Sequence, residues 1–364
     1  MDVTTVTFHD IGIVNRGKVR APALPDWLQF QLGQLGDASA ARIVVASQLD
    51  AARNTLGQLP ATAILRADLE ISKAAKLNWH RASPRFYWPD LQSRATDLEL
   101  LRLTPRLEYL YIFHRDGYLR EASLKKISGG LPSPFWFAAI SWRMNDWGIP
   151  VQVAARRCAE RVFPLTDAKV IAVAEVALLR RMQSWYRWRN ETGLIYEAFR
   201  RGEVVNELKQ TLVTGTMGGL GWILRSLLQR PDHDQLLPIL ARDARLPEIR
   251  AIAARALFDG HAKWPIGQTW EWADKSLGRK RRIPVFDRRP LTVSVPLTEL
   301  LRHAAKDKAA IVRSTAAGAL VQHYATLENR DEIIGLLISD KNLSIQARAD
   351  FVVRQLRKSD VPKS

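Results

Sequence analysis

The sequence predicts an all-α fold in which pairs of helices stack into a right-handed α-solenoid. Three observations lead to this prediction: a short signature recurs in register, each copy places its apolar residues on one helix face, and the copies follow a common step. The signature is an apolar residue followed by Arg or Gln, with small or apolar residues four and eight positions later. Its five copies begin at the apolar residues Leu119, Val151, Ile249, Val312 and Ile345, which are called the openers below.

Each copy has the periodicity of an amphipathic helix. In the third copy Ile249, Ala253 and Leu257 fall at i, i+4 and i+8, so they share one face. The residues four positions after the openers are Ser123, Ala155, Ala253, Ala316 and Ala349. Small side chains let a neighbouring helix approach closely, so we expect this face to pack against other helices. Apolar stripes that start at Leu220 and Leu297 indicate partner helices upstream.

The distances between the copies are typical of two-helix repeats. The first two openers and the last two are each separated by about 32 residues, the length of one such unit. The interval from 151 to 249 therefore has room for about three units, and that from 249 to 312 for about two. Residues 263 to 296 have no helical stripe, so we expect a non-helical insertion there.

An aspartate stands shortly before every copy, where its side chain could cap the start of the helix. These residues are Asp116, Asp146, Asp243, Asp307 and Asp340. The runs DARLPEIRAIAARALFDG and DKAAIVRSTAAGALVQHY resemble the second helices of HEAT repeats, an armadillo-like family of α-solenoids. The resemblance spans roughly residues 100 to 355, and Gln152 and Gln346 depart from it because that family has arginine there. It implies that Arg120, Arg250 and Arg313 form a structural ladder with the aspartates, and it specifies no chemistry.

The predicted domain organisation follows from where the repeat is visible. We expect an N-terminal arm and helical cap over residues 1–100, HEAT-like repeats over 101–262, a basic Trp- and Arg-rich insertion over 263–296, and C-terminal HEAT-like repeats over 297–358. The cap would contain helical segments near 26–57 and 60–77. A cap is expected because a solenoid must cover the apolar face of its terminal repeat.

Composition points to a cytoplasmic protein without a membrane anchor. No segment has the roughly 18 uninterrupted apolar residues of a membrane span, and the start MDVTTVTFHD does not resemble a signal peptide. The chain has 364 residues and a single cysteine, Cys158, which lies on the apolar stripe of its helix. We expect this thiol to be a buried packing residue.

The formal net charge of +17 indicates an acidic partner, and two clusters are candidate binding sites. The insertion holds eight basic and three acidic residues, and the candidates within it are Lys275, Arg279, Lys280, Arg281, Arg282, Arg288, Arg289, Trp270 and Trp272. The second cluster, in the run RRMQSWYRWRN, comprises Arg180, Arg181, Trp185, Arg187 and Arg189. Cations bind phosphates and aromatic rings stack on bases. In the second cluster, however, Trp185 and Trp188 could equally face the core of a helical protein.

Three functions remain open from the sequence. The first is a non-enzymatic binding module that engages the backbone of DNA or RNA, and the second is a scaffold for an acidic protein partner. The third is a HEAT-like DNA glycosylase, because Trp142 and Asp146 would share a helix face beside Trp147. No nucleotide-binding, metalloprotease or hydrolase motif is present, so we expect no cofactor and no metal site. His233 and Asp234 are expected to form a polar turn rather than to ligate a metal.

Overall fold

The computed structural model of the chain is mostly helical, and it describes residues 21–77, 91–182, 185, 192–216 and 219–359. The chain divides into two compact units, one ending at Glu207 and the other beginning at Leu208. The boundary falls inside the predicted block of repeats over 101–262. Within the described residues, none of the helices is both long and apolar enough to cross a membrane.

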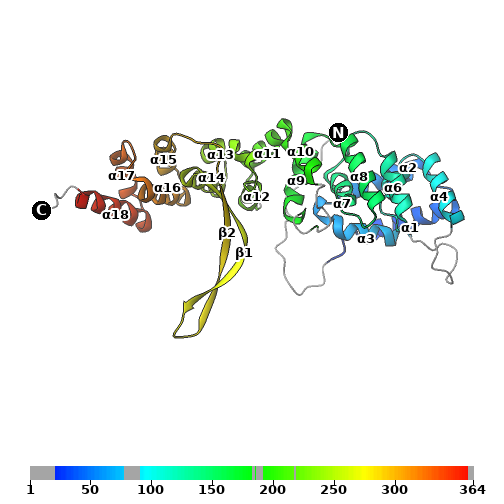
Figure 1. Cartoon of the computed structure of the whole chain (residues 1–364), viewed down its shortest axis with the longest axis horizontal. Helices are drawn as coiled ribbons and strands as arrows, with labels where there is room; N and C mark the ends of the chain where they lie inside the picture. The colour runs from blue at the N-terminus through cyan, green and yellow to red at the C-terminus, as the bar shows by residue number, and fades with distance from the viewer. Residues whose placement is uncertain (1–20, 78–90, 183–184, 186–191, 217–218, 360–364) are drawn as a thin grey trace. The chain divides into compact units, whose positions relative to one another are not determined.

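The N-terminal unit is built from helices alone in its described part (Figure 1). Its helices are α1 (Asp26–Ala41), α2 (Ala46–Gly57), α3 (Ile64–Ala74), α4 (Leu91–Leu103), α5 (Leu107–Tyr111), α6 (Gly117–Lys126), α7 (Pro134–Arg143), α8 (Ile149–Val162), α9 (Ala168–Met182) and α10 (Thr192–Arg200), with a 3-10 turn, η2, at Ala61–Ala63. The segment near 26–57 is two helices, because Arg42 takes a left-handed backbone conformation (φ 60°) that ends α1.

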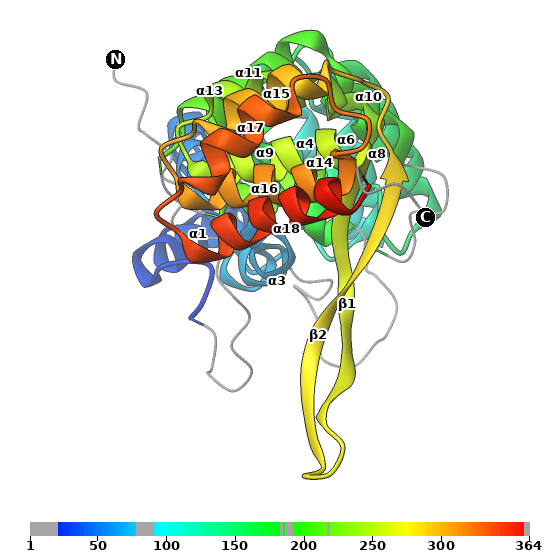
Figure 2. The same cartoon turned by 90° about the vertical axis from the view of Figure 1, so that its left-hand side faces the viewer.

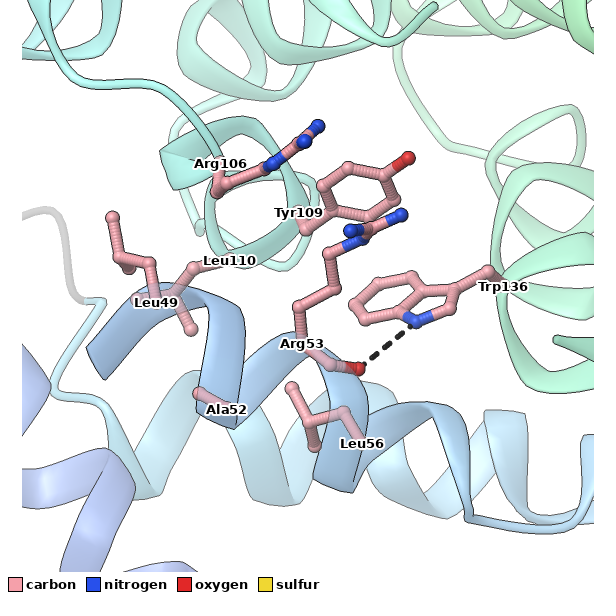
Figure 3. Close-up of a pocket in the computed structure, with 8 residues that line it drawn as sticks. All are labelled: Leu49, Ala52, Arg53, Leu56, Arg106, Tyr109, Leu110 and Trp136. Carbon is pink, nitrogen blue, oxygen red and sulfur yellow. Dashed lines mark hydrogen bonds between the residues drawn. The ribbon is translucent and has the colours of Figure 1, made fainter. Parts of the chain in front are cut away.

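Aromatic residues of α7 form the centre of this unit. Phe135, Trp136 and Phe137 are fully buried. Figure 3 shows a small pocket beside them, in which the Arg53 guanidinium lies 4.5 Å from the centre of the Tyr109 ring and Trp136 Nε1 donates to the Arg53 carbonyl at 3.2 Å. The space left is about that of one water molecule. The Arg53 side chain therefore fills the site as part of the packing.

The C-terminal unit combines helices with one long hairpin (Figures 1 and 2). Helix α11 (Gly202–Thr214) spans the boundary between the units. It is followed by α12 (Leu220–Leu227), η3 (Pro231–Leu236), α13 (Leu237–Asp243), α14 (Pro247–Asp259), β1 (His261–Asp274), β2 (Arg279–Pro290), α15 (Leu297–Ala305), α16 (Ala310–His323), α17 (Arg330–Ile338) and α18 (Leu343–Ser359). The stripes expected from Leu220 and Leu297 are α12 and α15, which bury Leu224, Leu227, Leu300 and Leu301.

The five copies of the signature are five helices in the same register. Helices α6, α8, α14, α16 and α18 each begin two residues before their opener. The small residues four positions after the openers have no solvent exposure in any copy, from Ser123 to Ala349. Helix α6 packs against α8, α14 against α16, and α16 against α18. The periodicity thus predicted both the helices and their packed faces.

The residue after each opener makes the same hydrogen bond in all five copies. Its side chain donates to the carbonyl oxygen six residues earlier, so it fastens the helix to the preceding turn. The donor and acceptor pairs are Arg120 and His114, Gln152 and Asp146, Arg250 and Ala244, Arg313 and Asp307, and Gln346 and Asp340. The Arg and Gln copies are therefore equivalent in this local bond.

The arginines make a second bond that glutamine is too short and uncharged to replace. Each guanidinium binds both carboxylate oxygens of an aspartate in the next copy, in the bidentate geometry that strengthens such pairs. The shortest distances are 2.8 Å from Arg120 to Asp146, 2.6 Å from Arg250 to Asp307, and 2.5 Å from Arg313 to Asp340. These three pairs confirm the predicted ladder, and each is called a rung below.

Two expectations about the aspartates are wrong in detail. Asp243 is the last residue of α13, and Ala244 occupies the turn position that Asp307 and Asp340 hold in later copies. Only Asp116 is an N-cap residue, accepting from the Tyr118 N–H. Each of the rung aspartates instead lies in the turn and accepts from the N–H group two residues on, as Asp307 does from Ala309.

The expected number of repeats between 249 and 312 is also corrected. Arg250 and Asp307 are 57 positions apart, whereas the other two rungs span 26 and 27 positions. The hairpin occupies 30 of those 57 positions, from His261 to Pro290, which leaves 27. The interval from Arg250 to Asp307 is therefore one step of the ladder, with the hairpin inserted between α14 and α15, and not the two units that were expected.

We expect the substitution Arg313→Gln to lower the free energy of unfolding of the C-terminal unit by about 1–3 kcal/mol. Glutamine keeps the bond to the carbonyl of residue 307 but leaves the Asp340 carboxylate, which is buried, without its cation. Thermal denaturation measures the change. Gln346→Arg is the matched control, and a shift near zero is expected for it because no later copy offers an aspartate in the described chain. Equal stability of Arg313→Gln and the unsubstituted chain would contradict the role of the rung.

The rungs also predict how stability depends on pH. The Arg313 hydrogen bond holds the pKa of Asp340 below its usual value, despite an opposing effect of burial. This carboxylate therefore stabilises the fold fully above its unfolded pKa, about 3.9, and the contribution is lost as the pH falls through the lower folded value. We expect Asp340→Asn to be less stable than the unsubstituted chain at pH 7 and the difference to shrink towards pH 3. Denaturation at both pH values tests this.

Candidate nucleic-acid interface

The predicted insertion forms a regular β-hairpin. β1 and β2 pair antiparallel from His261 opposite Pro290 to Asp274 opposite Arg279, with irregularities at Ile266 and Ala273 where β1 has an extra residue. The expectation of a non-helical segment is confirmed, but its limits are 261–290 and its structure is not a loop. The alternation of Trp270 and Trp272 with polar residues, ahead of a turn with glycine, was the available signal for strands.

The tip of the hairpin is closed by side-chain hydrogen bonds. Asp274 Oδ1 accepts from the N–H groups of Ser276 and Leu277 and from the Ser276 hydroxyl, and Gly278 has the positive φ (63°) that the end of the turn requires. The hydrogen bond of Ser276 is also the main reason that the pKa of Asp274 lies below its usual value. The tip therefore has a defined conformation.

The base of the hairpin is fastened by Asp234 from η3. This carboxylate has no solvent exposure, and it accepts from Arg289 Nη1 and Nη2 at 2.9 and 2.7 Å and from the N–H and hydroxyl of Thr292 at 2.9 Å. Burial alone would raise the pKa of Asp234, but the bonds from Arg289 and Thr292 outweigh burial and lower it. The sequence indicated only a polar turn at Asp234, so its role as the anchor of the hairpin was missed. Arg289, predicted to bind a partner, is instead part of this anchor.

Beyond its base the hairpin extends away from the helices of the C-terminal unit, as both views show (Figures 1 and 2). The base contacts α12 and α14. From Pro265 to Arg282 nearly every residue is exposed, including Trp270 at 59% and Trp272 at 47%. The predicted candidates on this segment are therefore accessible to a partner.

Cross-strand contacts set the positions of these side chains. Arg282 lies over the Trp270 ring at 4.8 Å and Lys280 over the Trp272 ring at 4.3 Å, which are cation–π distances. Arg281 pairs with Glu271 at 2.7 Å. Among the described residues, no carboxylate pairs with the predicted cations Lys275, Arg279, Lys280, Arg282 and Arg288.

The second predicted cluster is only partly described. Trp185 is buried and makes an edge-to-face contact with Trp142 at 5.1 Å, so it belongs to the core and not to a binding surface. Arg187 and Arg189, together with the side chains of Arg180 and Arg181, lie outside the described residues. The structure therefore brings together only the hairpin candidates.

The proposed glycosylase constellation does not assemble as expected. Helix α7 ends at Arg143, so Asp146 lies in the following turn and does not share a helix face with Trp142. Both oxygens of Asp146 accept from Arg120, and they also accept from Arg143 and the Gly148 N–H. Burial alone would raise the pKa of Asp146, but these groups lower it. Trp142 donates to Asp68, and Trp147 is 82% exposed. The Asp146 carboxylate is thus fully occupied by structural bonds.

The remaining candidates for chemistry are accounted for by packing. Cys158 is buried, and burial raises the pKa of its thiol to about 12, which opposes the thiolate form a nucleophile needs. No group of three or more His, Cys, Asp or Glu residues is arranged to hold a metal ion in the part of the chain that the structure describes.

No protein-family model, curated protein or solved structure matches this chain.

We expect Asp234→Asn to loosen the base of the hairpin, because a neutral amide cannot balance the Arg289 charge and offers fewer acceptor sites. Amide hydrogen exchange should be faster around Arg289 to Thr292, with α16 and α18 unchanged. Asp287→Asn is the control, because Asp287 lies close to the base and, among the described residues, accepts only from the N–H of its neighbour Arg288. Unchanged exchange at the base in Asp234→Asn would show that other contacts hold the hairpin.

Proposed function

We propose that this chain is an α-solenoid of HEAT-like repeats that binds the backbone of a nucleic acid through the β1–β2 hairpin. One observation carries the proposal: a protruding arm exposes several cations that pair with no carboxylate among the residues that the structure describes. Exposed Lys and Arg bind phosphates of any sequence, because binding releases the counterions condensed on the nucleic acid. The proposal assigns a binding role and no chemical step.

The rungs support the solenoid part of the proposal. The side chain after the opener makes the same local bond in five helices, and in the three where it is arginine it also binds the next copy's aspartate. This is a nearest-neighbour arrangement, in which each unit is fixed by the one beside it. Such a scaffold keeps its shape without a single central core, and it can hold an inserted arm at one of its connections.

The type and placement of the charges support phosphate as the ligand. Arginine presents a planar fork of N–H donors that matches phosphate oxygens, and Arg279 and Arg282 are exposed on the arm. Few of the hairpin's cations are used internally: Arg281 pairs with Glu271, Arg289 with Asp234, and Lys263 with Asp259. The net charge of +17 would in addition attract a polyanion over a longer range.

The direct test is a salt series of binding to fluorescently labelled DNA and RNA. Replacing Arg279, Lys280, Arg281 and Arg282 by Gln should weaken binding about 10- to 100-fold at low salt. It should also reduce the salt slope by about 0.9 for each of the four that contacts a phosphate. The control replaces four exposed helix cations, Lys73, Lys169, Arg354 and Arg357, and so lowers the net charge equally. Binding should change much less in this control.

Two outcomes would overturn the proposal. One is the absence of salt-dependent binding to any nucleic acid by the unsubstituted chain. The other is an equal loss of affinity in the hairpin and control variants, which would show that only net charge matters.

A scaffold that binds an acidic protein is the second candidate, favoured by apolar side chains on the arm. Ile266, Leu277 and Phe286 are exposed there. Apolar contact area of this kind is common in protein interfaces. Recovery of a stoichiometric acidic protein with the chain from its host, lost in the hairpin variant, would favour this function, provided that nucleic acid binding is absent.

A further inference from the structure

The hairpin has two chemically different faces. Side chains alternate between the faces of a strand, and the cross-strand contacts fix the assignment: Trp270 with Arg282 and Trp272 with Lys280 share one face, while Glu271 and Arg281 share the other. β2 pairs without an extra residue of its own, so alternation along it continues towards the base. Phe286 and Arg288 therefore lie on the face of Lys280 and Arg282, which is called the Trp face below.

The acidic residues of the hairpin are all kept off the Trp face. Glu271 and Asp287 lie on the opposite face, and Asp274 is used in the tip turn. The Trp face thus carries Lys280, Arg282 and Arg288 with no carboxylate from the hairpin beside them. On the opposite face Arg281 is neutralised by Glu271 and Arg289 is committed to Asp234, which leaves Arg279, next to the tip, as a cation without a carboxylate partner among the described residues. Most of the surplus charge of the arm therefore lies on the Trp face.

The shape of the arm and the state of its rings favour a double helix over a single strand. Proteins that bind single strands offer bare aromatic rings on which bases stack. Here a cation already lies over the rings of Trp270 and Trp272, so these two rings support cations that reach outwards. A two-stranded ribbon fits the major groove of B-form DNA, which is about 12 Å wide, whereas the major groove of double-stranded RNA is too deep and narrow for side chains to read.

We propose that the Trp face is the binding face of the arm and that its ligand is B-form duplex DNA, with the ribbon along the major groove. This inference rests on the proposed function, because it specifies which nucleic acid the arm binds and with which side. The opposite face points away from the duplex, where Glu271 and Asp287 are not repelled by phosphate.

The test compares substitutions on the two faces of the full-length chain. Gln268 lies on the Trp face and Thr269 on the opposite face, one residue away, and both are exposed. Gln268→Glu should weaken binding to a DNA duplex by about tenfold or more at low salt, because its carboxylate faces the phosphates. Thr269→Glu, which adds the same charge, should change binding less than about twofold. A second pair, Lys280→Gln with Arg282→Gln against Arg279→Gln with Arg281→Gln, removes equal charge from the two faces.

The ligand is tested with the same sequence as a DNA duplex, an RNA duplex and a DNA single strand. The DNA duplex should bind at least about tenfold more tightly than the other two at equal salt. Circular dichroism and hydrogen exchange verify that each variant keeps the hairpin.

The outcomes separate the two proposals. If the unsubstituted chain binds none of the three, the proposed function itself fails. If it binds but Gln268→Glu and Thr269→Glu are affected equally, nucleic acid binding stands and the Trp face is not the binding face. Equal or tighter binding to the RNA duplex or to the single strand overturns the assignment of the ligand.

Discussion

The structure depends on one recurring interaction, the side chain that follows each opener and binds the turn before its helix. The bond to the carbonyl six residues earlier holds each helix at a fixed orientation to that turn. Where the side chain is arginine, it also binds the aspartate of the next copy, and that aspartate organises its own turn by accepting from a backbone N–H. Each rung therefore joins a helix, its own turn and the following turn. Because these groups are largely buried, the removal of either partner leaves a charge without compensation.

The choice between arginine and glutamine has a physical explanation in this scheme. Arg120 is followed by Asp146, Arg250 by Asp307, and Arg313 by Asp340, whereas among the described residues no turn aspartate of a further copy follows Gln152 or Gln346. Gln152 and Gln346 stand at the ends of the two ladders, where a guanidinium would have no carboxylate to bind. The shorter, neutral amide of glutamine still donates to the carbonyl six residues earlier and adds no charge. Ala244, at the start of the second ladder, has a matching explanation: the preceding copy of the signature has Gln152, which needs no carboxylate, and Arg250 of the same copy binds the Ala244 carbonyl. The two ladders, 120–152 and 250–346, lie in different compact units.

The sequence predicted the ladder and its helices because the signal is local and repeated. The opener and the small residue recur at a fixed offset in all five copies, and an aspartate stands five positions before the opener in three of them, so several weak indications support one another. Asp243 was misassigned by one position because an aspartate happens to precede the true turn residue, Ala244. The anchor at Asp234 could not be predicted, because its partners Arg289 and Thr292 are 55 and 58 positions away and no local pattern links them. Trp185 was ambiguous for a similar reason: whether an aromatic beside arginines faces solvent depends on a distant residue, here Trp142.

The insertion point of the hairpin explains how the arm and the scaffold coexist. The hairpin leaves α14 at Gly260, whose positive φ ends the helix, and the Leu291 N–H returns to the Gly260 carbonyl, so both ends of the insertion meet at one residue. The chain therefore resumes its path almost where it left it. Arg250 binds both carboxylate oxygens of Asp307 across the insertion, as Arg313 binds both oxygens of Asp340. The insertion thus leaves this rung intact, and Asp234 of η3 binds the base of the hairpin. The Gly260–Leu291 bond and the Asp234 contacts together hold the base of the basic arm against the helices of its own unit, which gives its two faces a defined orientation there.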